Sequence, residues 1–469
     1  MTSDPGEAAP GMPMEAYVWI WLPGRTEPVV AGRLARDGSG HVFNYGRSYL
    51  DRPDAIPIYL PELPLRRGAI RPDPPLEMAG ALRDGAPDAW GRRVIINRLT
   101  GLKGMAAGAV DLDDLTFMLN AGSDRIGALD FQAAPDRYRP READQTVTIE
   151  DLHAAAGHVE RGEPVPPALD KALFHGSSIG GARPKALIDD GRTKLIAKFS
   201  ATNDTYAVVK AEYVAMRLAR DAAGLDVAPV RLARANGKDV LLVERFDRVW
   251  TERGWTRRAM VSALTMLGLH EMEARYASYR DLADLVRARF TRPRETLREL
   301  FGRVVFNVLS GNTDDHARNH AAFWDGTSLT LTPAYDICPQ LRSGRDANQA
   351  MLIGETDRRS RLETCRMAAH AFLLGDAEAC AIIAAQIAGI RAHWARICDE
   401  AELGAILTDG PGREGRRRHN RGERASVLPW GSLRLFARVT HNLRVLGILY
   451  RESGAALIGI RLHNVIRSI

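Results

Sequence analysis

The sequence predicts an α+β fold in which a β-rich first part precedes a helical last part, with polar motifs where the two parts meet. Short aromatic and β-branched runs, such as Ala16–Leu22, end at turn residues and are typical of strands. From Ser262 onward the chain is mostly helical, and apolar residues recur at helical spacing in Thr296–Ser310. The polar segment Ser310–Asn319 begins where that helix ends.

The first part contains several other predicted elements. Residues 134–142 are a polar connector, and Thr148 caps the helix that it begins. The expected strands are Val29–Leu34 and His41–Tyr45, and the expected helices are Ala86–Leu99, Leu112–Asn120 and Thr148–Glu160.

A Gly/Ser-rich segment, His175–Lys185, introduces the central part. A long helix, Tyr206–Ala223, stops at Gly224. The expected strands here are 186–188, 194–199, 227–232, 240–243 and 329–332, and the last expected helices are 368–374 and 378–397.

The composition is that of an ordinary globular protein, with 469 residues, 45% hydrophobic and 26% charged. Because no run of about 18 uninterrupted apolar residues exists, we expect no membrane span. Residues 1–15 lack a basic and apolar secretion signal and are expected to be a disordered leader. The four cysteines show no CxxC spacing, which favours a reduced, cytoplasmic protein.

The positive charge is concentrated at the end of the chain. Residues 401–469 hold 12 arginines, no lysine and five acidic residues, whereas the whole chain has a net charge of +6. Such asymmetry indicates either nucleic-acid contact or a solvated surface.

Two carboxylates and one carboxamide lie at defined offsets. Asp314 and Asn319 are five residues apart, as in a kinase catalytic loop, and Asp336 follows a short apolar stretch. Phosphoryl transfer needs a carboxylate that orients a hydroxyl and oxygen ligands that hold Mg²⁺ on the phosphates. The alternative is a polar loop with capping Asp and Asn residues.

A lysine and a Gly-rich loop precede this set in the order that a kinase requires. Lys198 ends a predicted strand, and Glu212 follows on the next helix as a possible ion-pair partner. The loop is not a Walker A motif, because Ala182 stands where lysine is required. The alternatives are a surface lysine and an ordinary turn.

The segment Glu244–Arg248 follows an apolar strand, where a hinge would offer backbone groups to an adenine. The alternative is a solvated run of charges. Zinc is unlikely at His316 and His320, because no Glu or Cys constellation accompanies them.

Four motifs together resemble the HipA family of serine/threonine kinase toxins. They are 178–185 (SIGGARPK), 244–248 (ERFDR), 311–319 (GNTDDHARN) and 333–337 (PAYDI), and Gly32–Tyr45 and 87–92 (PDAWGR) resemble that family's N-terminal domain. The resemblance covers about 16–400. Residues 401–469 depart from it and are an extension or the product of a reading-frame change.

The resemblance implies a two-lobed protein-kinase-like fold that uses ATP and Mg²⁺. It makes Asp314 the catalytic base, Asn319 and Asp336 the metal ligands, and Ser178 the site of autophosphorylation. The predicted ATP contacts are Ser178, Gly180, Gly181, Ala182, Lys185, Lys198, Glu244, Arg245, Phe246 and His316.

The resemblance also implies partners: a HipB-like helix-turn-helix antitoxin, operator DNA bound through the antitoxin, and a protein substrate such as an aminoacyl-tRNA synthetase. The alternatives are a catalytically silent pseudokinase scaffold and a small-molecule kinase. The expected domains are a leader (1–15), an N-terminal subdomain (16–135), a kinase N-lobe (136–260), a helical C-lobe (261–400) and an Arg-rich tail (401–469).

Overall fold

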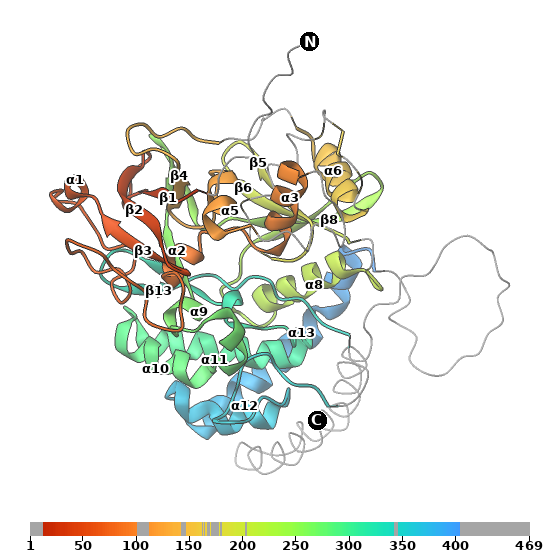
Figure 1. Cartoon of the computed structure of the whole chain (residues 1–469). Coiled ribbons are helices and arrows are strands. Elements are labelled where there is room, and N and C mark those ends of the chain that lie inside the picture. Colours follow the sequence, from red (N-terminus) through yellow and green to blue (C-terminus); the bar gives the residue numbers. More distant parts are fainter. Residues whose placement is uncertain are drawn as a thin grey trace, which may run out of the picture. The chain divides into compact units, whose positions relative to one another are not determined.

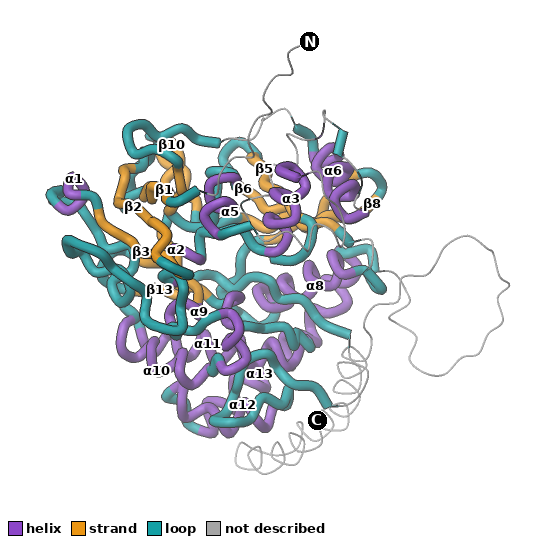
Figure 2. The backbone as a smooth tube through the Cα atoms, viewed as in Figure 1, coloured by secondary structure: helices purple, strands orange, loops and turns teal. Residues whose placement is uncertain are grey.

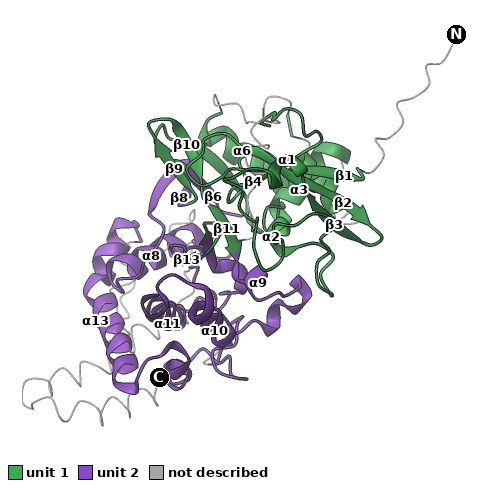
Figure 3. Ribbon diagram, turned by 90° about the vertical axis from the view of Figure 1, so that its left-hand side faces the viewer, with its two compact units in different colours: residues 1–194, 247–261, 324–327 green, residues 195–246, 262–323, 328–469 purple. Residues whose placement is uncertain are grey.

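The computed structural model describes residues 13–100, 112–141, 147–161, 181–201, 204–341 and 346–403, with positions 163, 165, 166, 169 and 178. The chain folds into two compact units (Figure 3). Unit 1 comprises residues 1–194, 247–261 and 324–327, and unit 2 comprises 195–246, 262–323 and 328–469. The chain therefore passes between the units more than once.

Unit 1 is built on an antiparallel sheet with the strand order β3-β2-β1-β4 (Figures 1 and 2). Val18 pairs with Gly32 on one side and with Phe131 on the other. A Cβ on Gly32 would lie 2.2 Å from the Asn44 carbonyl oxygen, so the close approach of β3 requires glycine. The strands are β1 (Glu15–Ile20), β2 (Val29–Asp37), β3 (Gly40–Tyr45) and β4 (Leu129–Gln132).

The helices of unit 1 include one cap that the sequence predicts, at Thr148, and one that it does not, at Asp113. The Thr148 hydroxyl accepts a hydrogen bond from the Asp151 amide at 3.2 Å, and Asp113 caps the helix expected at 112–120. The helices are α1 (Arg47–Leu50), α2 (Gly80–Arg83), α3 (Ala89–Thr100), α5 (Asp114–Asn120) and α6 (Ile149–Arg161).

Unit 1 also contains strands that the sequence analysis did not predict. A hairpin of β9 (Arg248–Thr251) and β10 (Gly254–Arg257) follows the charged segment 244–248. Strand β4 was not predicted either, because its four residues are too few to show an alternating pattern. Strand β11 (Ala259–Ser262) was also not predicted, whereas β5 (Lys185–Asp189) confirms the strand expected at 186–188.

Unit 2 begins with three antiparallel strands, in the order β6-β8-β7. Leu195, Ala197 and Phe199 are buried, and they alternate with half-buried residues along β6. The predicted strand 227–232 is shifted, because Val227 instead bridges in parallel to Ala334. The strands are β6 (Lys194–Phe199), β7 (Val230–Ala235) and β8 (Lys238–Glu244).

The rest of unit 2 is mainly helical, as predicted, with two short strands. Helix α11 starts at Pro293 and ends where Gly311 adopts a left-handed φ of 74°. The elements are α8 (Val208–Asp221), α9 (Ala263–Met266), η1 (Glu271–Tyr276), α10 (Tyr279–Arg289), α11 (Pro293–Ser310), η2 (Ala317–Asn319), β12 (Ala321–Trp324), β13 (Leu329–Leu331), α12 (Leu362–Ala368), η3 (Ala369–Phe372) and α13 (Asp376–Glu400).

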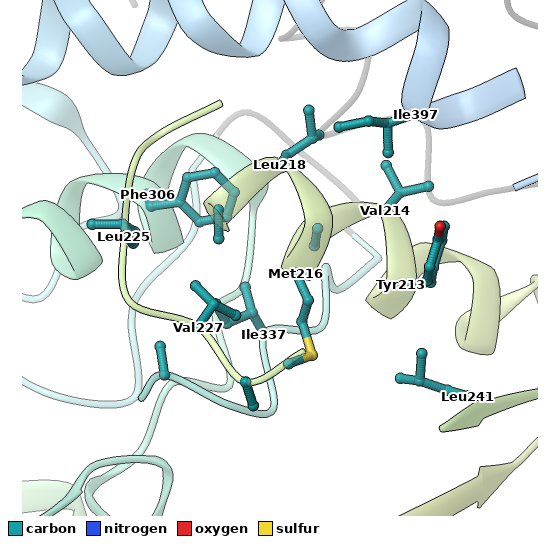
Figure 4. Packing of buried hydrophobic residues seen from close by; sticks show 14 of the residues in the cluster. Tyr213, Val214, Met216, Leu218, Leu225, Val227, Leu241, Phe306, Ile337 and Ile397 are labelled. Atoms are coloured by element: carbon teal, nitrogen blue, oxygen red, sulfur yellow. The ribbon is translucent and has the colours of Figure 1, made fainter. Parts of the chain in front are cut away.

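Helix α8 lies at the centre of the main hydrophobic cluster of unit 2 (Figure 4). Its side chains pack against Phe306 of α11, Ile337 and Ile397 of α13. Each such buried side chain contributes about 1.5–3 kcal/mol through removal of apolar surface from water. This cluster joins the helix that carries Glu212 to the segments before and after the catalytic loop.

Replacing Phe306 by alanine is expected to lower the free energy of unfolding by about 3–5 kcal/mol, because a fully buried ring leaves a cavity. Urea denaturation followed by circular dichroism measures the change. Tyr276→Ala is the control, since Tyr276 is exposed and its replacement should change stability by less than about 0.5 kcal/mol. Equal effects of the two changes would contradict the assigned core.

Candidate active site

Lys198 is held between two carboxylates within unit 2. Its Nζ lies 2.5 Å from Glu212 Oε1 on α8 and 2.5 Å from Asp336 Oδ1. Strand β6 fixes the backbone of Lys198, which pairs with Leu241 of β8. The ion pair with Glu212 that the sequence predicts is therefore present, and Asp336 joins it.

The two carboxylates determine the charge of this lysine. Burial alone would lower the pKa of the Lys198 ammonium, but Asp336 and Glu212 outweigh burial and raise that pKa above its ordinary value. Lys198 is therefore cationic at neutral pH, which suits an electrostatic contact to phosphate oxygens.

The catalytic-loop candidate 312–319 is shaped by its own backbone. The His316 amide donates to the Asp314 carbonyl at 3.0 Å, and the Asn319 amide donates to the His316 carbonyl at 2.8 Å. The Asn319 side-chain amide nitrogen donates to the Asp314 carbonyl at 3.1 Å. This hydrogen bond holds the Asn319 side chain through its nitrogen. The side-chain oxygen, which is the atom of a carboxamide that binds cations, is not used in it.

Asp314 is exposed, as a residue that meets a substrate hydroxyl must be. Protein atoms around its carboxyl reduce hydration and raise the pKa of Asp314, and the nearby Asp336 carboxylate raises it further. His316 partly opposes this shift in the pKa. Both His316 and Asp336 therefore lie within electrostatic reach of the Asp314 carboxyl.

Asp336 adopts a left-handed φ of 58°, which is uncommon outside glycine and often marks a functional position. The two residues before Asp336 hold the backbone of this segment in place. Ala334 exchanges backbone hydrogen bonds with Asp226 and Ala228, and the Tyr335 hydroxyl donates to the Arg318 carbonyl at 2.7 Å. Tyr335 thus connects the Asp336 segment to the catalytic-loop candidate.

A second polar pair supports the loop, and the sequence analysis did not assign it. His320 Nε2 lies 3.0 Å from Asp315 Oδ1 and 3.1 Å from the Tyr279 hydroxyl oxygen, and all three residues are buried. Asn312 donates to Asn307 Oδ1 at 3.1 Å. In the sequence, the His320–Asp315 contact is indicated only by the offset of five residues between the two.

The predicted hinge segment divides between the units. In unit 2, Glu244 is exposed, Arg245 is buried, and the Phe246 ring centroid lies 5.7 Å from that of Tyr335. The alternative of a solvated charge run is wrong for Arg245 and for the two residues that follow Phe246. In unit 1, buried Arg248 and Asp247 form an ion pair at 2.8 Å.

The Gly-rich loop belongs to unit 1, and its described residues are Ser178 and 181–185. Ser178 is buried, and its hydroxyl donates to the Asp124 carbonyl at 3.3 Å. Lys185 is buried and Ala182 is exposed. Gly180, and the Arg-rich part of the predicted tail, lie outside the described residues.

Within the described parts of the chain, no group of three or more His, Cys, Asp and Glu side chains is placed to hold a metal ion. Mg²⁺ does not need such a group, because one or two protein oxygens suffice when phosphates and water complete its shell. Asp336 and Asn319 would supply a carboxylate and an amide oxygen.

In the described parts of the chain, no helix is both long and apolar enough to cross a membrane.

A strand lysine paired with a helix glutamate, together with an Asp-x₄-Asn loop beside a second aspartate, defines a protein-kinase type of site. Two family models cover well over half of the chain: the HipA N-terminal domain matches residues 20–132, and the HipA-like C-terminal domain matches residues 177–394. The chain belongs to the HipA family and is a protein kinase.

Two individual relatives that are named as kinases are similar to this chain. "Putative kinase Y4mE" of Sinorhizobium fredii is 29% identical over 348 residues, which are 68% of this chain and 76% of that protein. The serine/threonine-protein kinase toxin HipA of Shewanella oneidensis is 28% identical over 184 residues, which are 34% of this chain and 42% of that protein.

A solved structure confirms the predicted fold. The structure of the Shewanella oneidensis HipA, HipB and operator DNA complex contains a chain that matches with a TM-score of 0.60 and 18% identity. The match covers 91% of this chain and 95% of that chain.

Proposed function

We propose that this chain is an ATP- and Mg²⁺-dependent serine/threonine kinase that acts as the toxin of a type II toxin–antitoxin system. The observation that carries the proposal is Lys198, which is held between Glu212 and Asp336 in unit 2. The Asp336 carboxylate also acts electrostatically on Asp314 and helps to raise the pKa of that residue. A scaffold without catalysis would not need a half-buried lysine held between two carboxylates in this arrangement.

Each residue has a distinct role in this proposal. Lys198 orients the α- and β-phosphates of ATP, and the backbone of Glu244–Phe246 contacts the adenine. Mg²⁺ bound by Asn319 and Asp336 would neutralise charge on the transferred phosphoryl group. Asp314 accepts the proton of the substrate hydroxyl, with His316 beside it.

Phosphoproteomics after induced expression tests this function. The wild-type chain should raise phosphoserine or phosphothreonine on specific host proteins, with an aminoacyl-tRNA synthetase as the first candidate, and should arrest growth. Asp314→Asn is the matched inactive variant, because the change is nearly isosteric at an exposed side chain. A phosphorylated metabolite without phosphoprotein would favour a small-molecule kinase, and no transfer at all would favour the pseudokinase alternative.

We propose that the partner is a HipB-like antitoxin, through which the complex reaches operator DNA. The proposal draws on the similar Shewanella oneidensis structure, in which HipA is found together with HipB and operator DNA. Co-expression with a HipB-like helix-turn-helix protein, followed by size-exclusion chromatography and an operator shift assay, tests it. Separate elution of the two proteins would contradict it.

Autophosphorylation at Ser178 is expected to switch the kinase off. A phosphoryl group adds about −1.5 to −2 charges at neutral pH. The buried position of Ser178, beside the Asp124 carbonyl, cannot accommodate that charge. Intact-mass spectrometry after incubation with ATP, with residual activity measured in parallel, checks this. Full activity at stoichiometric phosphorylation of Ser178 would contradict it.

A further inference from the structure

The motif at the start of helix α3 contacts the end of the Gly-rich loop within unit 1. Gly181 donates its amide to Asp88 Oδ2 at 2.5 Å, and Trp90 donates its amide to the Gly181 carbonyl at 3.1 Å. Both backbone polar groups of Gly181 are therefore engaged by residues more than 90 positions earlier in the chain.

Gly181 is also a residue whose conformation needs such support. Its φ of +106° lies in a region that favours glycine. An added Cβ would lie 2.0 Å from Lys185 Nζ, so the lysine side chain closes over this glycine. Because glycine has wide conformational freedom, the two hydrogen bonds from the α3 motif select one of many available loop shapes.

Two further contacts extend the same interface. Trp90 is buried, and its indole Nε1 donates to the Lys185 carbonyl at 3.1 Å. Arg93 Nη2 donates to the Ala182 carbonyl at 2.5 Å, and the Arg93 guanidinium lies 5.3 Å from the Trp90 ring centroid. Three of the five residues 181–185 are therefore hydrogen-bonded to Asp88, Trp90 or Arg93.

These contacts join two parts of the chain that match different family models. Asp88, Trp90 and Arg93 lie within the match to the HipA N-terminal domain, 20–132, whereas Gly181 and Lys185 lie within the match to the HipA-like C-terminal domain, 177–394. The N-terminal domain therefore contacts the loop that the proposed kinase uses for nucleotide phosphates.

We propose that Asp88, Trp90 and Arg93 form a clamp that positions the nucleotide-phosphate loop before ATP binds. This inference rests on the proposed kinase function. The clamp residues are positioning residues, because they act through the backbone of 181–185. Binding to a preorganised loop avoids the entropy cost of ordering it, so losing the clamp weakens ATP binding.

Steady-state kinetics of Asp88→Ala test the clamp. The variant should raise the KM for ATP about tenfold, the scale of one lost hydrogen bond to a charged acceptor. Its kcat should change less than about threefold, because Lys198, Asp314 and Asp336 all belong to unit 2. Asp88→Asn keeps an acceptor oxygen and should stay within about threefold of the wild-type KM.

Asp136→Ala is the matched control, since it removes an exposed aspartate of unit 1 and should leave the KM unchanged. Trp90→Phe keeps a large buried ring and removes only the indole donor. If Asp88→Ala proves unstable, the same KM increase in Trp90→Phe still tests the clamp.

Hydrogen exchange without nucleotide provides a readout independent of activity. In the wild type, peptides covering 181–185 should exchange slowly, and Asp88→Ala should speed their exchange about tenfold or more while other peptides stay unchanged. Unaltered exchange together with an unaltered KM would overturn the clamp. Faster exchange in a protein whose wild type binds no ATP would retain the clamp and refute the kinase proposal.

Discussion

Asp314→Asn is expected to lower the turnover of phosphoryl transfer by about 10² or more, the scale of a lost general base. The change is nearly isosteric and the side chain is exposed, so the fold should persist. Radiolabelled phosphate transfer to a protein substrate measures the rate. The KM for ATP should change little, because Asp314 meets the substrate hydroxyl and not the nucleotide.

The direction of the pKa shift at Asp314 adds a pH prediction. Its pKa is raised, so the carboxylate takes up a proton at a higher pH than an ordinary aspartate does. A base must be deprotonated to act, so kcat/KM should fall as the pH decreases through this raised pKa. This acid limb should disappear from the residual activity of Asp314→Asn.

Asp284→Asn is the control for both measurements, because it alters an exposed aspartate on helix α10. It should keep wild-type turnover and the wild-type acid limb. Near-normal transfer by Asp314→Asn, or an equal loss in Asp284→Asn, would remove Asp314 from the proposed mechanism.

Lys198→Met is expected to abolish measurable phosphoryl transfer and also to destabilise unit 2. The activity loss follows from removal of the cation proposed to hold the phosphates. The destabilisation follows from Glu212, which is buried and loses its 2.5 Å partner. Breaking a buried ion pair in this way costs about 3–5 kcal/mol.

A double variant separates the two effects. Lys198→Met combined with Glu212→Gln also removes the carboxylate that loses its lysine partner, so the free energy of unfolding should recover most of its loss while activity stays absent. Urea denaturation and the phosphate-transfer assay measure the two quantities on the same preparations. Recovery of activity in the double variant would show that Lys198 is structural and not a phosphate ligand.

The sequence alone was sufficient for features that depend on short segments. Periodicity predicted α8, α11 and most strands, because burial of one face imposes a local pattern of residues. The spacing of Asp314 and Asn319 indicated the catalytic loop that we propose, and Lys198 with Glu212 indicated the ion pair that the structure contains. Their order along the chain indicated the family.

Only the tertiary structure showed how distant polar residues combine. Asp247 and Arg248 were predicted to be a hinge or a solvated run, yet they form a buried ion pair in unit 1. Asp88 appeared only as part of a family motif, and its contact with Gly181 spans 93 positions. Such contacts leave no periodic signal, because each depends on one donor and one acceptor that chain folding brings together. Residue type and local spacing therefore determined the class of chemistry, while the fold decided which backbone groups position the loop for that chemistry.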